Sequence, residues 1–152
     1  MSYTIAVIGA TGNVGQEVLN NLVERGFPYQ QVHAVASNRS VGQPVSFGEQ
    51  ETLRVQGLED FDFSKIDLAF FCAGSDVSKV YAPKAAKQGA IVIDKASYFR
   101  LDPGVPLVIP EVNGDALKFE KGQIITSPNC VALPLAMVLK PLMDKVSIKR
   151  VV

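Results

Sequence analysis

Short apolar runs alternate along the chain with longer segments whose apolar residues recur at helical spacing. The first run, Thr4–Gly9, precedes an amphipathic pattern over Val14–Arg25, which Gly26 and Pro28 bring to an end. Five later runs have the length and composition of strands: Val32–Ser37, Ile66–Gly74, Ala90–Asp94, Pro106–Val112 and Gln123–Ser127. Two further helices are predicted at Val77–Gln88 and Leu135–Lys145, and a weakly signalled hairpin turn around Gly48.

The predicted strands are apolar on both faces. Strands of this kind, separated by helices, are typical of a parallel sheet that helices cover on both sides. The sequence therefore predicts an α/β fold, doubly wound around a mostly parallel sheet. The final run, Val146–Val152, is rich in β-branched residues and ends on two valines. An unpaired apolar strand would expose backbone groups that can pair with other chains. We therefore expect this run to lead into a further half of the protein.

Composition narrows the function classes. With 47% hydrophobic and 20% charged residues among 152, the chain can bury a sizeable core. Fifteen basic residues balance fifteen acidic ones without a Lys/Arg cluster, which argues against nucleic-acid and membrane partners. Two cysteines and one histidine provide neither a disulfide framework nor a metal site. The sequence has no signal-peptide pattern and no apolar stretch of membrane length, so a cytoplasmic protein is expected.

Three glycines follow the first strand in the stretch GATGNVG. Gly9 permits a tight turn, Gly12 lets a phosphate approach the backbone, and Gly15 permits close packing of helix on strand. The free N–H groups at the start of the helix favour a pyrophosphate. A glycine-rich turn without a ligand is the alternative. The strand–turn–helix context favours a Rossmann-like dinucleotide-binding domain.

The end of the second strand indicates which dinucleotide binds. An NAD site needs an acidic residue there to hold the ribose 2′-hydroxyl, whereas this chain has Ser37, Asn38, Arg39 and Ser40. Arg39 can pair with a 2′-phosphate, and the serine hydroxyls can add hydrogen bonds. A solvated surface arginine is the alternative. The residues favour NADP over NAD as cofactor.

Cys130 lies between a Ser-Pro-Asn turn and an apolar helix. A thiol at a helix N-terminus is a better nucleophile, although Pro134 places the regular start of this helix a few residues later. Burial as a small hydrophobe is the commoner fate of a cysteine, and it is the interpretation favoured for Cys72. Beside a nicotinamide site, a thiolate could add to an acyl group or aldehyde, with hydride passing between the thiohemiacetal carbon and the nicotinamide.

Six stretches carry a resemblance to a known family. They are VIGATGNVGQEVL, SNRSVGQPV, VSKVYAPKAAKQGAIVID, FRLDPGVPLVIPEVN, SPNC and LKPLMD with IKRVV. In order and spacing, the chain resembles bacterial aspartate-semialdehyde dehydrogenase from Met1 nearly to Val152. The resemblance covers only the first part of such an enzyme.

The resemblance implies an oxidoreductase that reduces the acyl phosphate 4-phospho-L-aspartate to L-aspartate 4-semialdehyde with NADP. This reaction feeds lysine (through diaminopimelate), threonine and methionine biosynthesis. Cys130 would be the acyl-thioester nucleophile. The implied binding residues are Thr11, Gly12, Asn13 and Val14 at the cofactor pyrophosphate, Arg39 and Ser40 at the 2′-phosphate, Ala73 and Gly74 along the cofactor, and Arg100 and Asn129 at the substrate phosphate.

The resemblance also implies a division of the chain. Residues 1–129 would form the dinucleotide-binding domain, and residues 130–152 the cysteine helix and the start of a catalytic and dimerisation domain. The resemblance implies that the general-base histidine, other substrate-binding residues and most of the homodimer interface belong to the later half. His33, the one histidine here, matches no catalytic position of the family. Losing a general base forfeits a factor of about 10²–10⁴, so this chain alone is expected to be essentially inactive.

Three positions depart from the family pattern. Val131 and Ala132 replace small hydroxyl residues after the cysteine, and Lys95 replaces a residue that is often Asn or Ala. A short-chain dehydrogenase is disfavoured because no tyrosine has a lysine four residues later. Two alternatives stay open: an N-acetyl-gamma-glutamyl-phosphate reductase, and a non-catalytic NADP-binding remnant or split-gene fragment.

Overall fold

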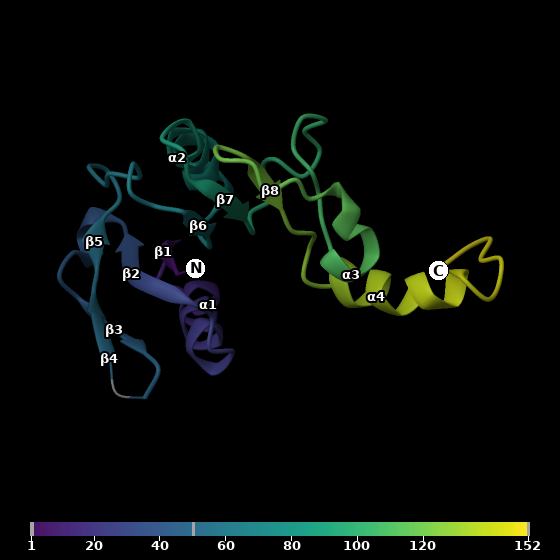
Figure 1. Cartoon of the computed structure of the whole chain (residues 1–152), viewed down its shortest axis with the longest axis horizontal. Coiled ribbons are helices and arrows are strands. Elements are labelled where there is room, and N and C mark those ends of the chain that lie inside the picture. The colour runs from purple at the N-terminus through teal and green to yellow at the C-terminus, as the bar shows by residue number, and fades with distance from the viewer. Residues whose placement is uncertain (1, 50, 152) are drawn as a thin grey trace.

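A six-stranded parallel sheet organises the chain (Figure 1), in a computed structural model that describes residues 2–49 and 51–151. The strand order is β5-β2-β1-β6-β7-β8. The strands are β1 (Tyr3–Ile8), β2 (Tyr29–Ala36), β5 (Gln56–Gly57), β6 (Leu68–Phe71), β7 (Ile91–Asp94) and β8 (Ile124–Thr126). All pairings in this sheet are parallel, so the carboxyl ends of β1, β6, β7 and β8 share one edge. The predicted Rossmann-like α/β class is confirmed.

Two helices cover opposite faces of the sheet. Helix α1 (Asn13–Glu24) buries Leu19 and Leu22 in one core with the odd-numbered β1 side chains, Ile5 and Val7. Helix α2 (Ser75–Lys87) contributes Ala82 and Ala85 to the other core, which contains Ala6, Ile8, Phe71 and Val92. Side chains alternate between the two faces of a strand, so this division is what a doubly wound sheet requires.

A hairpin covers part of the α1 face. Strands β3 (Pro44–Phe47) and β4 (Glu51–Arg54) pair antiparallel, and Val45 and Phe47 enter the α1-side core. The predicted turn lies at Gly48, whose φ is +69°. Gln50, within the same predicted stretch, lies outside the described residues.

Two strand predictions are wrong. In Pro106–Val112 only Leu107 makes a bridge, to Thr126, and Pro110 starts the short helix α3 (Pro110–Asn113), which a 3-10 turn (Gly114–Ala116) follows. Proline lacks the N–H that a ladder needs, and it suits the first turn of a helix. The described part of the last apolar run, Val146–Val151, is not a strand, and Val152 lies outside the described residues. Helix α4 carries this run away from the sheet, where it has no strand partner (Figure 1).

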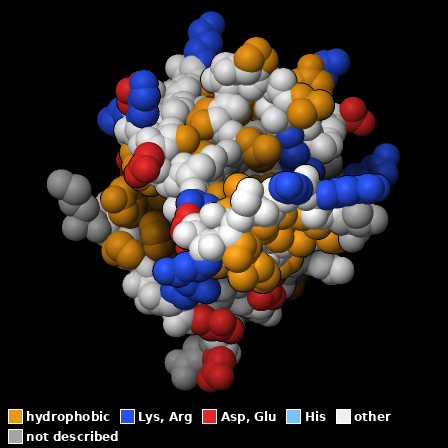
Figure 2. Space-filling view, turned by 90° about the vertical axis from the view of Figure 1, so that its right-hand side faces the viewer, with side chains coloured by type: hydrophobic (Ala, Val, Ile, Leu, Met, Phe, Trp, Pro, Cys, Tyr) orange, Lys and Arg blue, Asp and Glu red, His pale blue; other side chains and the backbone are white. Residues whose placement is uncertain are grey.

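Helix α4 (Ala132–Met143) is apolar but unburied. It packs beside α3, and none of its residues is buried. Figure 2, viewed from the α4 side of the molecule, shows hydrophobic side chains gathered on the surface. The exposed apolar residues in and beside the helix are Val131, Leu135, Met137, Val138, Leu142, Met143 and Val146. In the described part of the chain, α4 and the other helices are too short or too polar to cross a membrane.

Candidate active site

A cavity of about 430 Å³ opens at the carboxyl edge of the sheet beside Cys130. Residues from the glycine loop, the ends of β6 and β7, and the turn before α4 surround it. Its lining consists of Val14, Cys72, Ala73, Lys95, Arg100, Pro128, Asn129, Cys130 and Leu133. Four segments that are far apart in the sequence therefore meet around one thiol.

Strand register explains why these segments meet. Phe71 pairs with Asp94, and Asp94 pairs with Thr126, at the ends of β6, β7 and β8. Beyond the strands, the Lys95 N–H donates to the Phe71 carbonyl at 3.0 Å, and the Ser127 N–H donates to the Asp94 carbonyl at 3.0 Å. The residues that leave the three strands are thereby held side by side.

Cys130 is exposed in the turn that leads into α4. The turn is fixed by Asn129, whose Oδ1 accepts a 2.8 Å hydrogen bond from the Val131 N–H. The Asn129 carbonyl also accepts from the Leu133 N–H at 3.0 Å. The side-chain oxygen of Asn129 therefore stabilises the backbone around Cys130, and Asn129 also lines the cavity. The helix starts at Ala132, two residues before the proline expected near its start.

The guanidinium of Arg100 binds the backbone of two segments that line the cavity or lie next to it, at Lys95 and Ser127. Nε donates to the Ser127 carbonyl at 3.0 Å, and Nη2 donates to the Lys95 carbonyl at 2.9 Å. The half-buried side chain also lines the cavity, so it is not a solvated surface arginine. Its planar group ties the segment after β7 to the segment after β8.

Asp94, the last residue of β7, is fully buried. Its Oδ1 accepts hydrogen bonds from Ser78 Oγ at 2.8 Å and from the Ala96 N–H at 2.9 Å, while Oδ2 has no partner among the described residues. Burial raises the pKa of the Asp94 carboxyl, and these two hydrogen bonds and the Arg100 charge oppose the rise. The carboxyl therefore holds the turn after β7 in place.

The two thiols of the cavity differ sharply. Cys72 directly follows β6 and is half-buried. It packs against the α1-side core, although the sequence predicted that it would be buried as a small hydrophobic residue. Burial raises the pKa of its thiol to about 12, against the opposing effect of the nearby Lys95 ammonium. A thiol with so high a pKa is a poor nucleophile at neutral pH. Cys130 is the accessible thiol of the pair.

The glycine loop has the geometry that a dinucleotide site requires. Gly9 has a φ of +86°, and a Cβ there would lie 2.9 Å from the Cys72 carbonyl oxygen. A Cβ on Gly15 would overlap the Gly9 carbonyl. At Gly12, by contrast, the only atom near a Cβ would be the Gly9 oxygen at 3.4 Å, so the backbone is open on that side. Thr11, Gly12, Asn13 and Val14 are all exposed at the start of α1.

The other predicted cofactor residues lie along the same edge. Ser37 precedes a short 3-10 turn (Asn38–Ser40) at the carboxyl end of β2, and Arg39 is exposed on it. Ala73 and exposed Gly74 connect β6 to α2, and Gly74 is the N-cap of that helix. Of these residues, only Ala73 lines the Cys130 cavity.

His33 lies elsewhere. It sits in β2, its Nδ1 is 3.0 Å from Gln56 Nε2, and its ring meets Phe61 edge-on. Burial lowers the pKa of this imidazole. No group of three or more His, Cys, Asp or Glu side chains suited to a metal occurs over residues 2–49 and 51–151.

Sequence reasoning did not place Lys95 or Cys72 in the site. Both directly follow strands, β7 and β6, that neighbour each other in the parallel sheet. Residues that follow adjacent parallel strands share one edge, which is where α/β proteins bind ligands. Once the strand order is known, the positions of Lys95 and Cys72 directly after two neighbouring strands predict that both lie at this edge.

A doubly wound parallel sheet with a glycine loop between its first strand and first helix is the arrangement of a Rossmann-like NAD(P)-binding domain, here with an exposed thiol beside it. The family model described as "Semialdehyde dehydrogenase, NAD binding domain" matches residues 4–119. The chain therefore belongs to the semialdehyde dehydrogenase family, and within it the chain is similar to aspartate-semialdehyde dehydrogenases.

Three relatives illustrate this similarity. The aspartate-semialdehyde dehydrogenase of Rickettsia bellii is 58% identical over 151 residues, which are 99% of this chain and 44% of the relative. The crystal structure of aspartate semialdehyde dehydrogenase II from Vibrio cholerae, complexed with ASA, has a TM-score of 0.92 at 42% identity over 99% of this chain and 49% of that one. The Candida albicans enzyme with NADP has a TM-score of 0.76 at 28% identity, over 94% and 47%. The chain thus spans about half the length of these relatives.

Proposed function

We propose that this chain is the cofactor-binding and thiol-bearing part of an NADP-dependent aspartate-semialdehyde dehydrogenase. The observation that carries the proposal is the shared cavity, in which Cys130 lies together with Val14 of the glycine loop and Ala73 after β6. A thiol and a nicotinamide site must meet in this way for hydride to reach a carbon bound to sulfur. The relatives' names support aspartate semialdehyde as the product.

The chemistry uses Cys130 twice. Its thiolate attacks the acyl carbon of 4-phospho-L-aspartate, the C–O bond to phosphate breaks, and a thioester and inorganic phosphate result. NADPH, when bound, supplies a hydride to the thioester carbon. The thiohemiacetal on Cys130 then gains a proton and releases aspartate 4-semialdehyde, which restores the thiol. Arg100 would face the phosphate, with Asn129 holding the turn that carries the thiol.

The residues at the end of β2 support NADP as the cofactor. Arg39 is exposed, Ser37 and Ser40 flank it, and no acidic side chain follows β2 to hold a ribose 2′-hydroxyl. A 2′-phosphate would pair with the guanidinium and the hydroxyls. The open side of Gly12 suits the pyrophosphate. The NADP in the Candida albicans relative agrees with this choice.

The remaining length of the relatives would complete the site. We infer that it supplies the general-base histidine, further substrate contacts, and the interface of a cytoplasmic homodimer. The unburied apolar surface of α4 supports the presence of such a covering part. The full-length protein would then provide aspartate semialdehyde for lysine, threonine and methionine synthesis.

The proposal is tested by alkylating Cys130 with iodoacetamide, with and without NADP, and locating the label by peptide mass spectrometry. We expect Cys130 to react much faster than Cys72, and NADP to change the Cys130 rate severalfold. The Cys130→Ser variant is the blank. A Cys130 rate that is indifferent to saturating NADP would contradict a shared cofactor and thiol site.

A non-catalytic NADP-binding module is the second candidate. It is favoured by Val131 and Ala132, which follow the cysteine where the resemblance implies small hydroxyl residues; Val131 is 71% exposed. NADP binding by fluorescence titration, together with an inert Cys130, would select this alternative.

A further inference from the structure

Charge is distributed unevenly around the Cys130 cavity. Its lining contains two cations, Lys95 and Arg100, and no acidic residue. The nearby Asp94 is fully buried, and its Oδ1 accepts hydrogen bonds from Ser78 and Ala96, so this carboxyl does not line the cavity. A cavity with this charge is suited to an anion.

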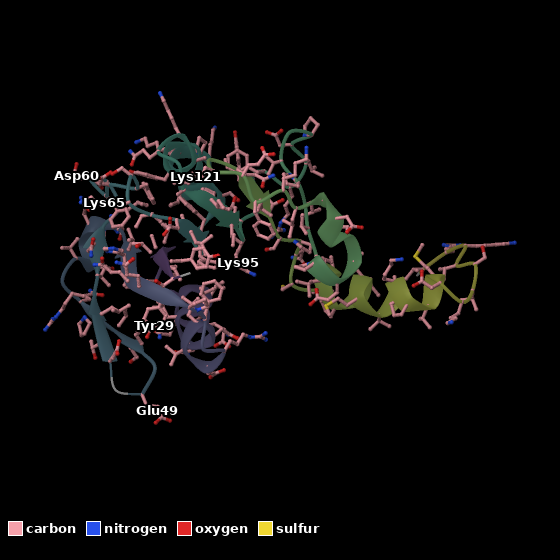
Figure 3. All side chains as sticks on the ribbon, viewed as in Figure 1. Tyr29, Glu49, Asp60, Lys65, Lys95 and Lys121 are labelled. Atoms are coloured by element: carbon pink, nitrogen blue, oxygen red, sulfur yellow. The ribbon has the colours of Figure 1, made fainter. Side chains whose placement is uncertain are left out.

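The backbone of Lys95 is held by two hydrogen bonds, whereas its side chain projects into the cavity region without a bonding partner among the described residues. Its N–H donates to the Phe71 carbonyl at 3.0 Å, and its carbonyl accepts from Arg100 Nη2 at 2.9 Å. The side chain is exposed, and among the described residues it forms no salt bridge. Figure 3 shows Lys95 on the side of the sheet that faces α3 and α4. The ammonium of Lys95 is therefore available to a ligand in the Cys130 cavity.

We propose that Lys95 binds the phosphate of the acyl-phosphate substrate, together with Arg100, in the Cys130 cavity. This inference rests on the proposed function and adds a substrate-binding residue to it. The guanidinium of Arg100 spends Nε and Nη2 on backbone carbonyls, which leaves it a reduced set of donors for a ligand. A lysine can supply the missing charge as a mobile point cation with three donors.

The role of Lys95 follows the course of the reaction. When the Cys130 thiolate attacks, the C–O bond breaks and negative charge moves onto the departing phosphate. A cation beside that oxygen favours bond breaking because it stabilises the charge that develops there. The cofactor pyrophosphate is the other anion in reach, since Val14 of the glycine loop lines the same cavity. The two anions make different predictions.

The test uses the full 152-residue chain and inorganic phosphate as the probe. Iodoacetamide labelling of Cys130 is followed at increasing phosphate concentration, and the concentration that halves the rate is determined. We expect this concentration to rise about three- to tenfold in Lys95→Gln, as befits the loss of one charge-assisted contact. We expect Lys95→Arg to stay within about twofold of the parent, because the positive charge is retained.

A charged reagent gives an independent readout. The ratio of Cys130 rates with anionic iodoacetate and neutral iodoacetamide should fall about threefold in Lys95→Gln, because one positive charge leaves the cavity. Lys87→Gln is the matched control, since Lys87 is an exposed lysine on α2 that does not line the cavity. Circular dichroism checks that the exposed substitutions leave the fold intact.

Three results would overturn the inference. These are no protection of the parent chain by phosphate, equal protection in Lys95→Gln, or a Lys95→Gln variant that loses NADP affinity while its phosphate protection is unchanged. The last result would assign Lys95 to the cofactor. A parent chain whose Cys130 ignores NADP would instead reject the proposed function, whatever phosphate does, so the two failures are distinguishable.

Discussion

The guanidinium of Arg100 holds the backbone of Lys95, with Nη2 donating to the Lys95 carbonyl at 2.9 Å. Nε of the same group donates to Ser127, so one side chain joins the segments after β7 and β8. The position of the proposed phosphate-binding lysine therefore depends on the arginine beside it.

Arg100→Gln is expected to weaken the connection between the segments that follow β7 and β8. Both hydrogen bonds of the half-buried guanidinium are lost or weakened, which should lower the free energy of unfolding by about 1–3 kcal/mol. Urea denaturation measures the change. Arg100→Lys should recover the charge but only part of the stability, since an ammonium cannot bridge both carbonyls with fork geometry. Equal stability of all three proteins would contradict this role.

Asp94→Asn should change how stability depends on pH. The raised pKa of the buried carboxyl means that the folded state holds its proton more tightly than the unfolded chain does. Below the ordinary Asp pKa of about 3.9 both states are protonated and nothing is lost. As pH rises through the folded-state pKa, the parent loses stability, and above that pKa the loss is constant.

The variant lacks this titration, and its Oδ1 can still accept from Ser78 and Ala96. Thermal unfolding of both proteins between pH 4 and 8 would measure the difference, with buffer ionic strength held constant. A difference between parent and variant that does not vary with pH would exclude a shifted Asp94.

Gly15→Ala and Gly12→Ala form a matched pair within one loop. The Gly15 methyl would overlap the Gly9 carbonyl, so we expect a loss of about 2–3 kcal/mol in stability. The Gly12 methyl finds ordinary contact distance and a φ of −89°, so stability should change by less than about 0.5 kcal/mol. NADP affinity should nevertheless fall about tenfold in Gly12→Ala. Chemical denaturation and fluorescence titration separate the two effects.

Arg39→Gln should discriminate between the two dinucleotides. If Arg39 pairs with the 2′-phosphate, NADP affinity falls about ten- to a hundredfold, while the weaker NAD affinity stays unchanged. Calorimetric titration with each dinucleotide measures this. Equal losses for NADP and NAD would place Arg39 outside the 2′-phosphate site.

Hydrophobic patterning was sufficient for five of the six strands of the sheet and for the helices that cover it, but not for β5 (Gln56–Gly57), which is too short to leave a pattern. Buried strands such as Ile5–Ile8 and the amphipathic α1 leave strong local signals, and Gly9, Gly12 and Gly15 mark the loop between them. The Pro106–Val112 run was misread because its apolar content outweighed the two prolines. The 146–151 run was misread because β propensity cannot show whether a neighbouring strand is available.

Only some of the residues that line the candidate site could be predicted from the sequence. Cys130 was predicted from its position before a helix, and Arg100 was predicted through the family resemblance. Lys95 and Cys72 line the same cavity because of the strand register, which is a long-range property. The buried Asp94, with its single unpaired oxygen, was also invisible, because burial of a carboxyl depends on packing from α2 and both neighbouring strands.

Helix α4 begins two residues after Cys130. The helix buries none of its residues, and it is joined to the sheet through the turn that carries the thiol, where Asn129 clamps the backbone. Because only this short turn lies between them, we expect the position of the Cys130 sulfur to depend on the orientation of α4. A part of the protein that covers the apolar surface of α4 is therefore expected to affect the reactivity of Cys130 as well as the burial of the helix.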